Sequence, residues 1–400
     1  MANTILTATA ITRAALVILH NNLRFTRTIR RNYDDQYKVN GAKAGNSLQI
    51  RLPNRFVSVT GAALSGSLDT TEQQVTLVRG TQRHVDTNFT TQELTTDLQD
   101  FSDRIIEPGM SQLAADTDFD AMLMYRDVYH LVGTAGVTPA SARVLLQAHT
   151  KLNHMAAPMT PRYAGLGPDA NEALVDALKG LFNPGGKLSE NYEEGLLARN
   201  QLGYRELYMS QSVRVHTNGT QGGTPLVNGA AQTGASLITD AWTAANTLTQ
   251  GSVFTVAGVF SVNPETRAST GQLQQFVATA LGTADGGGNM TISISPSIVT
   301  SGALQTVSGS PADNAALTLV GSASTGYVQN LAYHRDAFGI AFADLEMPQN
   351  VHFSAREVMD DISMRIVRDY RIGTDDIPCR IDIFYGYKTL RAPLASRITG

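Results

Sequence analysis

Apolar and polar residues alternate in two segments of the N-terminal third of the chain. Leu48, Ile50 and Leu52 alternate in the first segment, and Val75 and Leu77 lie on one face of the second. Alternate residues of a strand share a face, and the Gly/Ser/Thr-rich stretch 60–71 lies between the two segments. The pattern predicts a long β-hairpin over 41–89 with a mobile tip. Because an isolated two-stranded hairpin is only marginally stable in water, we expect this one to lie on another surface.

Helical spacing of apolar residues marks the N-terminus and the region 93–132. In the long region, steps of three and four residues join two stripes: Leu94, Leu98, Phe101 and Ile105, then Met110, Ala114, Thr117, Ala121, Met124, Val128 and Leu131. Pro108 should break or kink this helix, which would be roughly 60 Å long if continuous. Residues 1–31 predict an amphipathic helix followed by a basic arm. Further helices are expected at 141–155 and 169–182, the second with Asp169 as its N-cap, and a short strand at 204–210.

Residues 213–326 differ in composition from the rest of the chain. From 215 to 326 there is no Lys, and Gly, Ser, Thr and Ala dominate. Short β-like runs separated by turn residues predict an inserted all-β domain, a small barrel. Disorder is the alternative for 217–240 and 301–314. From 327 an α/β pattern resumes, and the alternating runs 361–372 and 379–390 predict a β-hairpin in the core sheet.

Composition narrows the class of protein. Four hundred residues predict two or more compact units. The net charge of −4 argues against a dedicated nucleic-acid binder. A single cysteine, Cys379, excludes an intrachain disulfide and a cysteine zinc site. The longest early apolar run is too short to span a bilayer, so we expect a soluble protein made in a cytoplasm, without membrane contact.

Basic residues gather near the N-terminus, where no Asp or Glu precedes Asp34. Two interpretations are open at about even weight. The arginines either form a solvated helix face or belong to an inner-surface arm that meets phosphate or an acidic partner. The candidates are Arg13, Arg24, Arg27, Arg30 and Arg31.

No catalytic constellation is present in the sequence. His334, Arg335 and Asp336 spell the start of a kinase catalytic loop, but Ala341 stands where that loop needs a metal-binding Asn. Phosphate-binding loops, dinucleotide fingerprints and nucleophile elbows are also absent. We therefore predict that the chain is not an enzyme and carries no cofactor or metal.

One aspartate pattern and one histidine pattern also do not match the spacing of known metal sites. Asp116, Asp118 and Asp120 alternate as in a calcium loop, but Ala121 replaces the required Gly, which favours a solvated helix face. His149 and His154 are five residues apart on one predicted helix, a spacing that does not direct both at one metal.

Longer patterns carry a resemblance to a known family. The segment 89–114, FTTQELTTDLQDFSDRIIEPGMSQLA, resembles the start of the long spine helix of tailed-phage major capsid proteins. Segments 331–348 and 362–395 resemble the C-terminal part of the podovirus-type coat proteins that carry an inserted β-domain. The resemblance covers nearly the whole chain in the same order.

The resemblance implies an α+β protein with the Hong Kong 97-type capsid fold. Its implied domains are an N-terminal arm (1–40), an extended loop (41–89), a peripheral domain with the spine helix (90–138), an axial domain in two parts (139–212 and 327–400, the second with the C-terminal hairpin and tail) and an inserted all-β domain (213–326). The implied function is that of a major capsid protein of a tailed double-stranded DNA bacteriophage.

The resemblance also implies partners. The chain would assemble with itself as pentamers and hexamers of an icosahedral shell, on a scaffolding protein and with a portal, around DNA held by non-specific contact. It would be assembled in the host cytoplasm and reside in the virion. His334, Arg335 and Asp336 would then form turn hydrogen bonds or a subunit contact, where the chain re-enters the axial domain. Alternatives are an encapsulin-like nanocompartment shell, an enzyme with dispersed catalytic residues, and a phage tail or adhesin protein.

Overall fold

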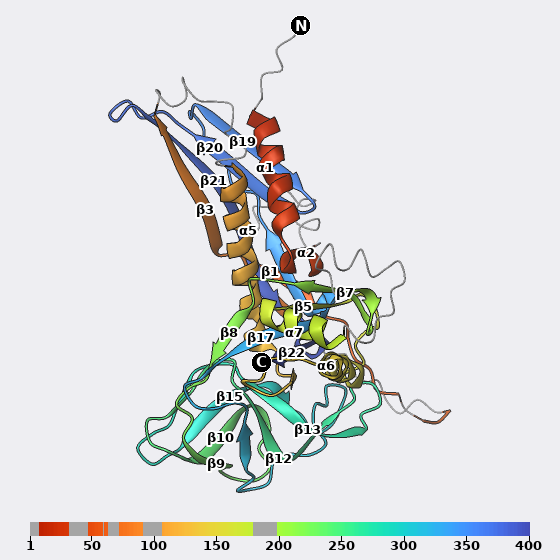
Figure 1. Cartoon of the computed structure of the whole chain (residues 1–400). Coiled ribbons are helices and arrows are strands. Elements are labelled where there is room, and N and C mark those ends of the chain that lie inside the picture. The colour runs from red at the N-terminus through yellow and green to blue at the C-terminus, as the bar shows by residue number, and fades with distance from the viewer. Residues whose placement is uncertain (1–7, 32–46, 59, 63–71, 91–105, 179–197) are drawn as a thin grey trace. The chain divides into compact units, whose positions relative to one another are not determined.

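The computed structural model describes residues 8–31, 47–58, 60–62, 72–90, 106–178 and 198–400 (Figure 1). The chain forms two compact units, as its length predicts, and each is discontinuous in sequence. The first comprises Met1–Ile50, Val75–Met122 and Phe338–Lys388, and the second comprises Arg51–Gln74, Leu123–Ala337 and Thr389–Gly400. This division differs from the predicted domains, because residues 338–388 group with the N-terminal helices and not with 327–337.

The first unit packs helices on a five-stranded sheet. Its helices are α1 (Ala8–Asn22), α2 (Phe25–Thr28) and α5 (Glu107–Ala121). Its sheet has the order β18-β21-β20-β19, with β3 also paired to β21. The strands are β3 (Thr81–Thr90), β18 (Phe338–Phe342), β19 (Phe353–Met359), β20 (Ile362–Arg368) and β21 (Asp376–Thr389). Helices α1 and α5 pack against each other, and α1 also packs on β19 and β20 (Figure 1).

The predicted C-terminal hairpin is confirmed as β20 and β21, paired antiparallel. Cys379, Ile381, Ile383 and Tyr385 of the predicted apolar face are buried. Tyr387 is only half-buried. The alternation of the sequence therefore predicts the face of β21 that packs inward.

Helix α5 forms only part of the helical pattern over 93–132, in which Pro108 predicts a break or kink. The described helix begins at Glu107 with Pro108 in its first turn, where a missing backbone N–H costs nothing. It ends at Ala121, and the 3₁₀ helix η2 (Met122–Asp127) follows. The later stripe residues Val128 and Leu131 are buried without being helical, because Leu131 begins the strand β4. The predicted stripe from Leu94 to Ile105 lies outside the described residues.

The predicted hairpin over 41–89 is confirmed only in part. Strands β1 (Ser47–Arg51) and β2 (Gln74–Val78) form a two-stranded sheet. Residues 81–89 do not belong to it, because β3 pairs antiparallel with β21 from Tyr385 to Asp376. The carbonyl of Val78 approaches β21 so closely at Gly386 that a Cβ there would collide with it. The predicted mobile tip falls largely on residues 63–71, outside the described residues.

The second unit contains a seven-stranded mixed sheet of order β4-β22-β17-β5-β7-β6, with β8 beside β17. Its strands are β4 (Leu131–Val132), β5 (Arg162–Leu166), β6 (Ala198–Gln201), β7 (Tyr204–Met209), β8 (Arg214–Thr217), β17 (Gly326–His334) and β22 (Ala395–Thr399). Two short 3₁₀ turns, η3 (Arg335–Ala337) and η4 (Ala392–Leu394), join its parts. The strand predicted at 204–210 is thus confirmed as β7.

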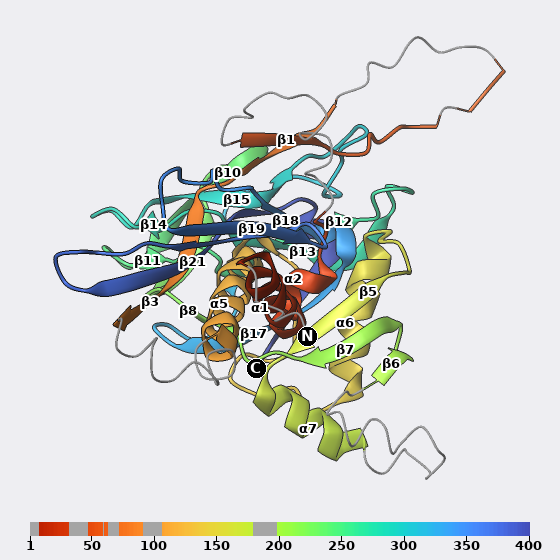
Figure 2. The same ribbon diagram turned by 90° about the horizontal axis from the view of Figure 1, so that it is seen from above.

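Two helices of the second unit match the helical spacing of the sequence. Helix α6 (Ala142–His154) lies beside the sheet (Figure 2), buries Leu145, Ala148 and Leu152, and is capped by the Ser141 hydroxyl. Helix α7 (Pro168–Leu178) starts one residue earlier than predicted. Asp169 therefore lies within its first turn and is not the N-cap, because Pro168 already occupies the first helical position.

The all-β insert is confirmed as a nearly closed barrel. Its six-stranded sheet has the order β16-β12-β13-β15-β10-β9. The strands are β9 (Gly223–Val227), β10 (Gly234–Trp242), β12 (Val253–Val262), β13 (Ser269–Ala278), β15 (Met290–Ile298) and β16 (Leu317–Leu319), with the short pair β11 (Thr247–Leu248) and β14 (Gly282–Thr283). The two edges meet where the Val227 amide donates to Ala315 and its carbonyl accepts from Asn314. Segments 217–240 and 301–314, considered for disorder, are both part of the described fold.

Candidate functional site

The His334-Arg335-Asp336 trio lies at a turn. His334 ends β17, and η3 follows before β18 begins. The Asp336 amide donates to His334 Nδ1 at 3.2 Å, and the Arg335 amide donates to the Pro161 carbonyl at 3.3 Å. His334 Nε2 lies 3.3 Å from the Thr160 carbonyl. Atoms of the trio thus form hydrogen bonds at this turn. Its predicted role in a subunit contact stays a prediction.

The apolar residues that flank the trio are buried. Leu331 and Tyr333 lie in β17, and Phe338, Ile340 and Phe342 lie in β18, each at most 1 % exposed. Burial lowers the pKa of His334, although the bond to Thr160 and the nearby Asp336 act in the opposite direction. His334 is thus part of the packing around this turn.

The five N-terminal arginines do not share one environment. Arg13 and Arg24 are exposed on α1 and just before α2, and Arg13 lies 3.8 Å from Glu357. Arg30 is exposed while its backbone bridges to β18, and Arg27 is half-buried. Arg31 is buried, and its Nη2 lies 2.5 Å from Asp360 Oδ2. Arg31 is therefore buried against a carboxylate of its own chain.

Asp360 fastens the N-terminal helices to the sheet of the first unit. Asp360 and Asp361 form the two-residue turn between β19 and β20, both with positive φ (50° and 61°). Aspartate tolerates this left-handed conformation better than most residues. The Asp360 carboxylate receives Arg31 and also lies 3.0 Å from His20 Nε2.

Asp118 of α5 is a buried helix cap and not part of a solvated face, which corrects the prediction. Its Oδ2 accepts from the amides of Arg24 and Phe25 at 2.7 and 3.1 Å. Its Oδ1 accepts from the Thr26 amide at 2.9 Å. These are the unpaired amides at the start of α2, which has no cap of its own. Burial raises the pKa of Asp118, while the hydrogen bonds from residues 24–26 oppose this shift.

Asp120 is also buried, which again differs from the predicted solvated helix face. Arg83 of β3 donates to both of its oxygens, with Nη2 at 2.8 Å from Oδ2, and the Tyr385 hydroxyl donates to Oδ2 at 2.9 Å. The bond to Asp120 raises the pKa of Arg83. Helix α5 is therefore tied to α2 through Asp118 and to β3 and β21 through Asp120. Only Asp116 is partly exposed, as expected of a solvated face.

Asp382 anchors the polar face of the five-stranded sheet. Its side chain is fully buried and lies 2.8 Å from Arg365 Nη2 and 2.6 Å from Arg380 Nε, while Gln82 donates at 3.0 Å. Burial alone would raise the pKa of Asp382, but these three donors hold it below its usual value. The carboxylate therefore links β3, β20 and β21 on the face opposite Tyr385.

Arg397 holds together the second unit. It is 1 % exposed, and its guanidinium donates to the carbonyls of Val128 at 2.6 Å and Gly251 at 2.7 Å. Burial lowers its pKa to about 9. His216 lies nearby, 3.2 Å from the Tyr125 hydroxyl, and burial lowers its pKa to about 4. The periodicity of the sequence could not predict the role of Arg397. A buried arginine needs hydrogen-bond acceptors, but the sequence pattern does not show which residues supply them.

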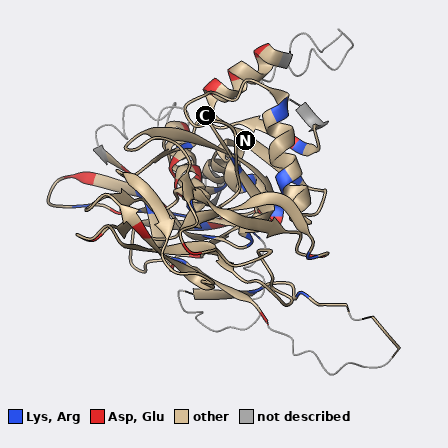
Figure 3. Cartoon of the chain, turned by 90° about the horizontal axis from the view of Figure 1, so that it is seen from below, with Lys and Arg blue, Asp and Glu red and all other residues tan. Residues whose placement is uncertain are grey.

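Within the described ranges, no group of three or more His, Cys, Asp or Glu side chains could hold a metal ion. Figure 3 shows basic and acidic residues interspersed along the described chain, with acidic residues along α7. The same ranges contain no helix that is both long and apolar enough to cross a membrane.

Comparison with known proteins identifies the family. The family model of the P22 coat protein (gene protein 5) matches residues 20–396. No curated protein matches the sequence. Because the family match spans nearly the whole chain, it favours a phage coat protein over the encapsulin-like alternative.

Solved structures give weaker likenesses. Mycobacterium phage Che8 matches at 11 % identity over 94 % of this chain and 90 % of that chain, with a TM-score of 0.48. The capsid of Ralstonia phage GP4 matches at 9 % identity over 94 % and 87 %, with a TM-score of 0.48. A virus-like particle from Pyrococcus furiosus matches at 9 % identity over 97 % and 98 %, with a TM-score of 0.42. These TM-scores are too low to carry an argument, and the assignment rests on the family match.

The described architecture agrees with that match. The chain is α+β, with helices on an antiparallel sheet and an inserted β-barrel, as expected of a Hong Kong 97-type capsid protein. The protein belongs to the P22 coat protein family, and it is a phage major capsid protein that self-assembles into the icosahedral shell of the virion.

Proposed function

We propose that this chain forms the shell of a tailed double-stranded DNA bacteriophage as pentamers and hexamers. Its assembly would use a scaffolding protein and a portal, take place in the host cytoplasm, and enclose DNA by non-specific contact. The observation that carries the proposal is the match to the P22 coat protein family over residues 20–396.

Within this proposal, the parts of the chain have separate tasks. We assign an N-terminal arm to 1–40, an extended loop to 41–89, a peripheral domain to 90–138, an axial domain to 139–212 and 327–400, and an inserted domain to 213–326. The two-stranded sheet β1–β2 supports the loop assignment, since such a sheet alone is marginal and gains from a neighbouring subunit. Many modest contacts of this kind add up through multivalency, and symmetric closure leaves no free edge.

The N-terminal arginines are our candidates for charge on the inner surface. Arg13, Arg24 and Arg30 are exposed and therefore support this role better than Arg31, which is buried against Asp360. Cations placed there would neutralise scaffold carboxylates or DNA phosphates, and the contact would weaken with added salt.

Arginine substitutions test this assignment. Replacing Arg24, Arg27 and Arg30 with Gln should reduce the yield of DNA-filled particles, and it should leave Arg31 and its pair with Asp360 intact. Arg31→Gln serves as the matched control, because it should lower subunit stability rather than packaging. Particle yield and DNA content after gradient sedimentation give the readout. Normal packaging by the triple variant would remove the arginines from the proposal.

A further inference from the structure

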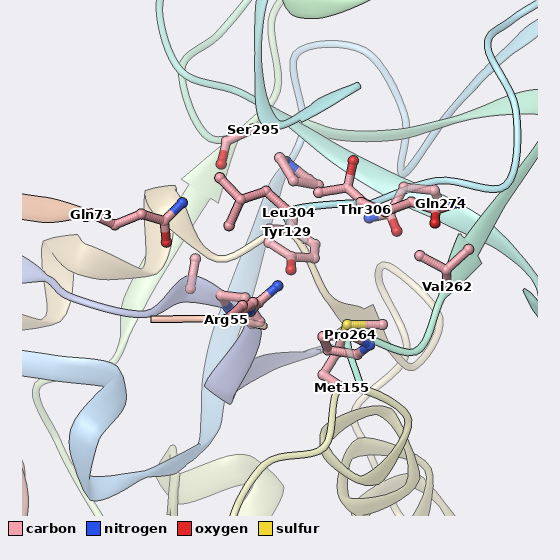
Figure 4. Close-up of a pocket in the computed structure, with 14 residues that line it drawn as sticks. Arg55, Gln73, Tyr129, Met155, Val262, Pro264, Gln274, Ser295, Leu304 and Thr306 are labelled. Carbon is pink, nitrogen blue, oxygen red and sulfur yellow. The ribbon is translucent and has the colours of Figure 1, made fainter. Parts of the chain in front are cut away.

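A cavity of about 190 Å³ lies within the second unit (Figure 4). That volume is well above the ~10–15 Å³ that one water molecule requires on the same measure. Its walls come from the predicted extended loop (41–89), from the core around η2, α6 and η4, and from the β-barrel. The lining includes Arg55, Gln73, Tyr129, Met155, Gln274 and Thr306.

Arg55 supplies a positive charge without an acidic counterpart. None of the residues that line the cavity is an Asp or a Glu. Arg55 is half-buried, and no ion pair or hydrogen bond joins its guanidinium to any residue that the structure describes. Arg391 lies close enough for the charge of Arg55 to lower its pKa, after the larger effect of burial. The cavity wall is therefore electropositive.

Two fully buried arginines of this unit differ from the half-buried Arg55, because their guanidinium groups have acceptors within the chain. Arg162 is fully buried, and its guanidinium donates to the Pro158 and Ala157 carbonyls at 2.8 and 2.7 Å and to Asn153 Oδ1 at 2.7 Å. Arg397 is satisfied by carbonyls in the same way. A guanidinium withdrawn from water normally has such partners, because an unpaired one loses hydration without compensation.

Tyr129 adds a polar group to the same cavity. It is 4 % exposed, and none of the hydrogen bonds among the described residues involves its hydroxyl. Figure 4 shows Arg55 and the Tyr129 hydroxyl directed toward one another inside the cavity. A cation and a hydroxyl donor that converge on an open space are suited to an oxygen anion.

We propose that this cavity is an oxyanion site, in which Arg55 and the Tyr129 hydroxyl bind a carboxylate or phosphate group. Arginine suits both groups, since its planar fork matches their paired oxygens. The anion has two possible sources, a carboxylate side chain of a neighbouring subunit in the shell or a dissolved ion. Binding of a dissolved ion does not depend on assembly. Binding of a neighbouring subunit's carboxylate rests on the proposed function as a shell protein.

Unassembled subunits test the site with inorganic phosphate as the probe. Thermal unfolding is measured with phosphate and with chloride at equal ionic strength, for the wild type, Arg55→Gln and Arg51→Gln. Arg51 is the matched control, because its side chain is 80 % exposed and only 3.9 Å from Glu72 at the surface. Phosphate should raise the Tm of the wild type and of Arg51→Gln. Its affinity should fall by at least about tenfold in Arg55→Gln, the loss expected for one charge-assisted contact.

Tyr129→Phe keeps the experiment informative if Arg55→Gln does not fold, because it removes only the hydroxyl. It should weaken phosphate binding several-fold. A cryo-EM map of assembled shells then separates the two sources, since density against Arg55 would be either a neighbour's carboxylate or an isolated ion. Equal phosphate responses in all variants would overturn the proposal. So would an absent response in subunits together with an empty cavity in shells.

Discussion

Asp118 offers the sharpest test of how the first unit is held together. Asp118→Ala would remove the acceptor of three backbone amides, at 2.7, 3.1 and 2.9 Å, without giving water access to them. Each buried amide left unpaired costs about 1–3 kcal/mol. Loss of a helix cap typically costs ~0.5–2 kcal/mol. With partial relaxation of α2, we expect a loss of roughly 3–5 kcal/mol, a large share of the ~5–15 kcal/mol that stabilises a typical domain.

Asp118→Asn should cost less, because only one of the two carboxylate oxygens is lost. The amide oxygen can take the position shared by Arg24 and Phe25, and the new NH₂ group would then face the Thr26 amide, donor against donor. We expect a loss of about 1–3 kcal/mol, between the wild type and Asp118→Ala.

Denaturant unfolding of unassembled subunits, followed by circular dichroism, measures these differences. Asp116→Ala on the same helix is the control. The Asp116 carboxylate is partly exposed, and among the described residues it accepts a hydrogen bond only from Gln112, at 3.1 Å. Its loss should therefore change the free energy of unfolding by no more than about 0.5 kcal/mol. If Asp118→Ala were as stable as Asp116→Ala, the cap would not matter and the account of α2 would be wrong.

Three further predictions concern titration and the turn at 334–336. His216 has a pKa of about 4 against 6.5 when unfolded, so its contribution to stability is complete above pH 6.5 and is lost as the pH falls toward 4. That loss of stability is about 3 kcal/mol. The free energy of unfolding of His216→Gln, measured with denaturant at pH 7 and pH 5, should therefore differ less between the two pH values than that of the wild type. Asp382 has a lowered pKa, so its contribution is present above 3.8 and is lost as the pH falls below that value. Asp382→Asn should be less stable at pH 6 and should lack this acid-dependent loss; an unchanged acid profile would contradict the pairing with Arg365. Asp336→Asn should lower folding yield or shell assembly, measured by sedimentation, and full assembly with loss of a turnover activity would contradict its structural role.

Periodicity predicted those parts of the fold that local geometry decides. Strand β21 alternates cleanly, and its apolar residues from Cys379 to Tyr385 are the buried ones. Helix α6 follows its stripe of Val144, Leu145, Ala148 and Leu152. The sudden loss of charge after residue 214 marked the barrel, because a fold made of short strands and turns needs Gly, Ser and Thr more than salt bridges.

Pairing between distant segments could not be read from the sequence. Strand β3 continues the alternation of β2, yet it pairs with β21, almost 300 residues later. The stripe of α5 runs on through Val128 in the sequence, but the backbone leaves the helix after Ala121. The local sequence does not predict the partner of β3 or the end of α5, because both depend on which distant surface the buried residues pack against.

The buried charges were the most difficult residues to predict. Asp118 and Asp120 look like a solvated helix face, since their partners in α2, β3 and β21 are distant in sequence. One local sign was available for Asp118. The N-cap position of α2 is Arg24, which supplies no side-chain cap, so an acceptor had to come from elsewhere. For the cavity at Arg55, the sequence offered no sign, because its lining comes from nine separate stretches of the chain.

Assembly of the purified chain tests the central claim most directly. The protein is expressed with and without a scaffolding protein, and the particulate fraction is imaged by cryo-electron microscopy. We predict closed icosahedral shells built from this chain alone, more uniform in size when the scaffolding protein is present. A chain that remains a stable, compact monomer under both conditions would contradict its role as a capsid subunit.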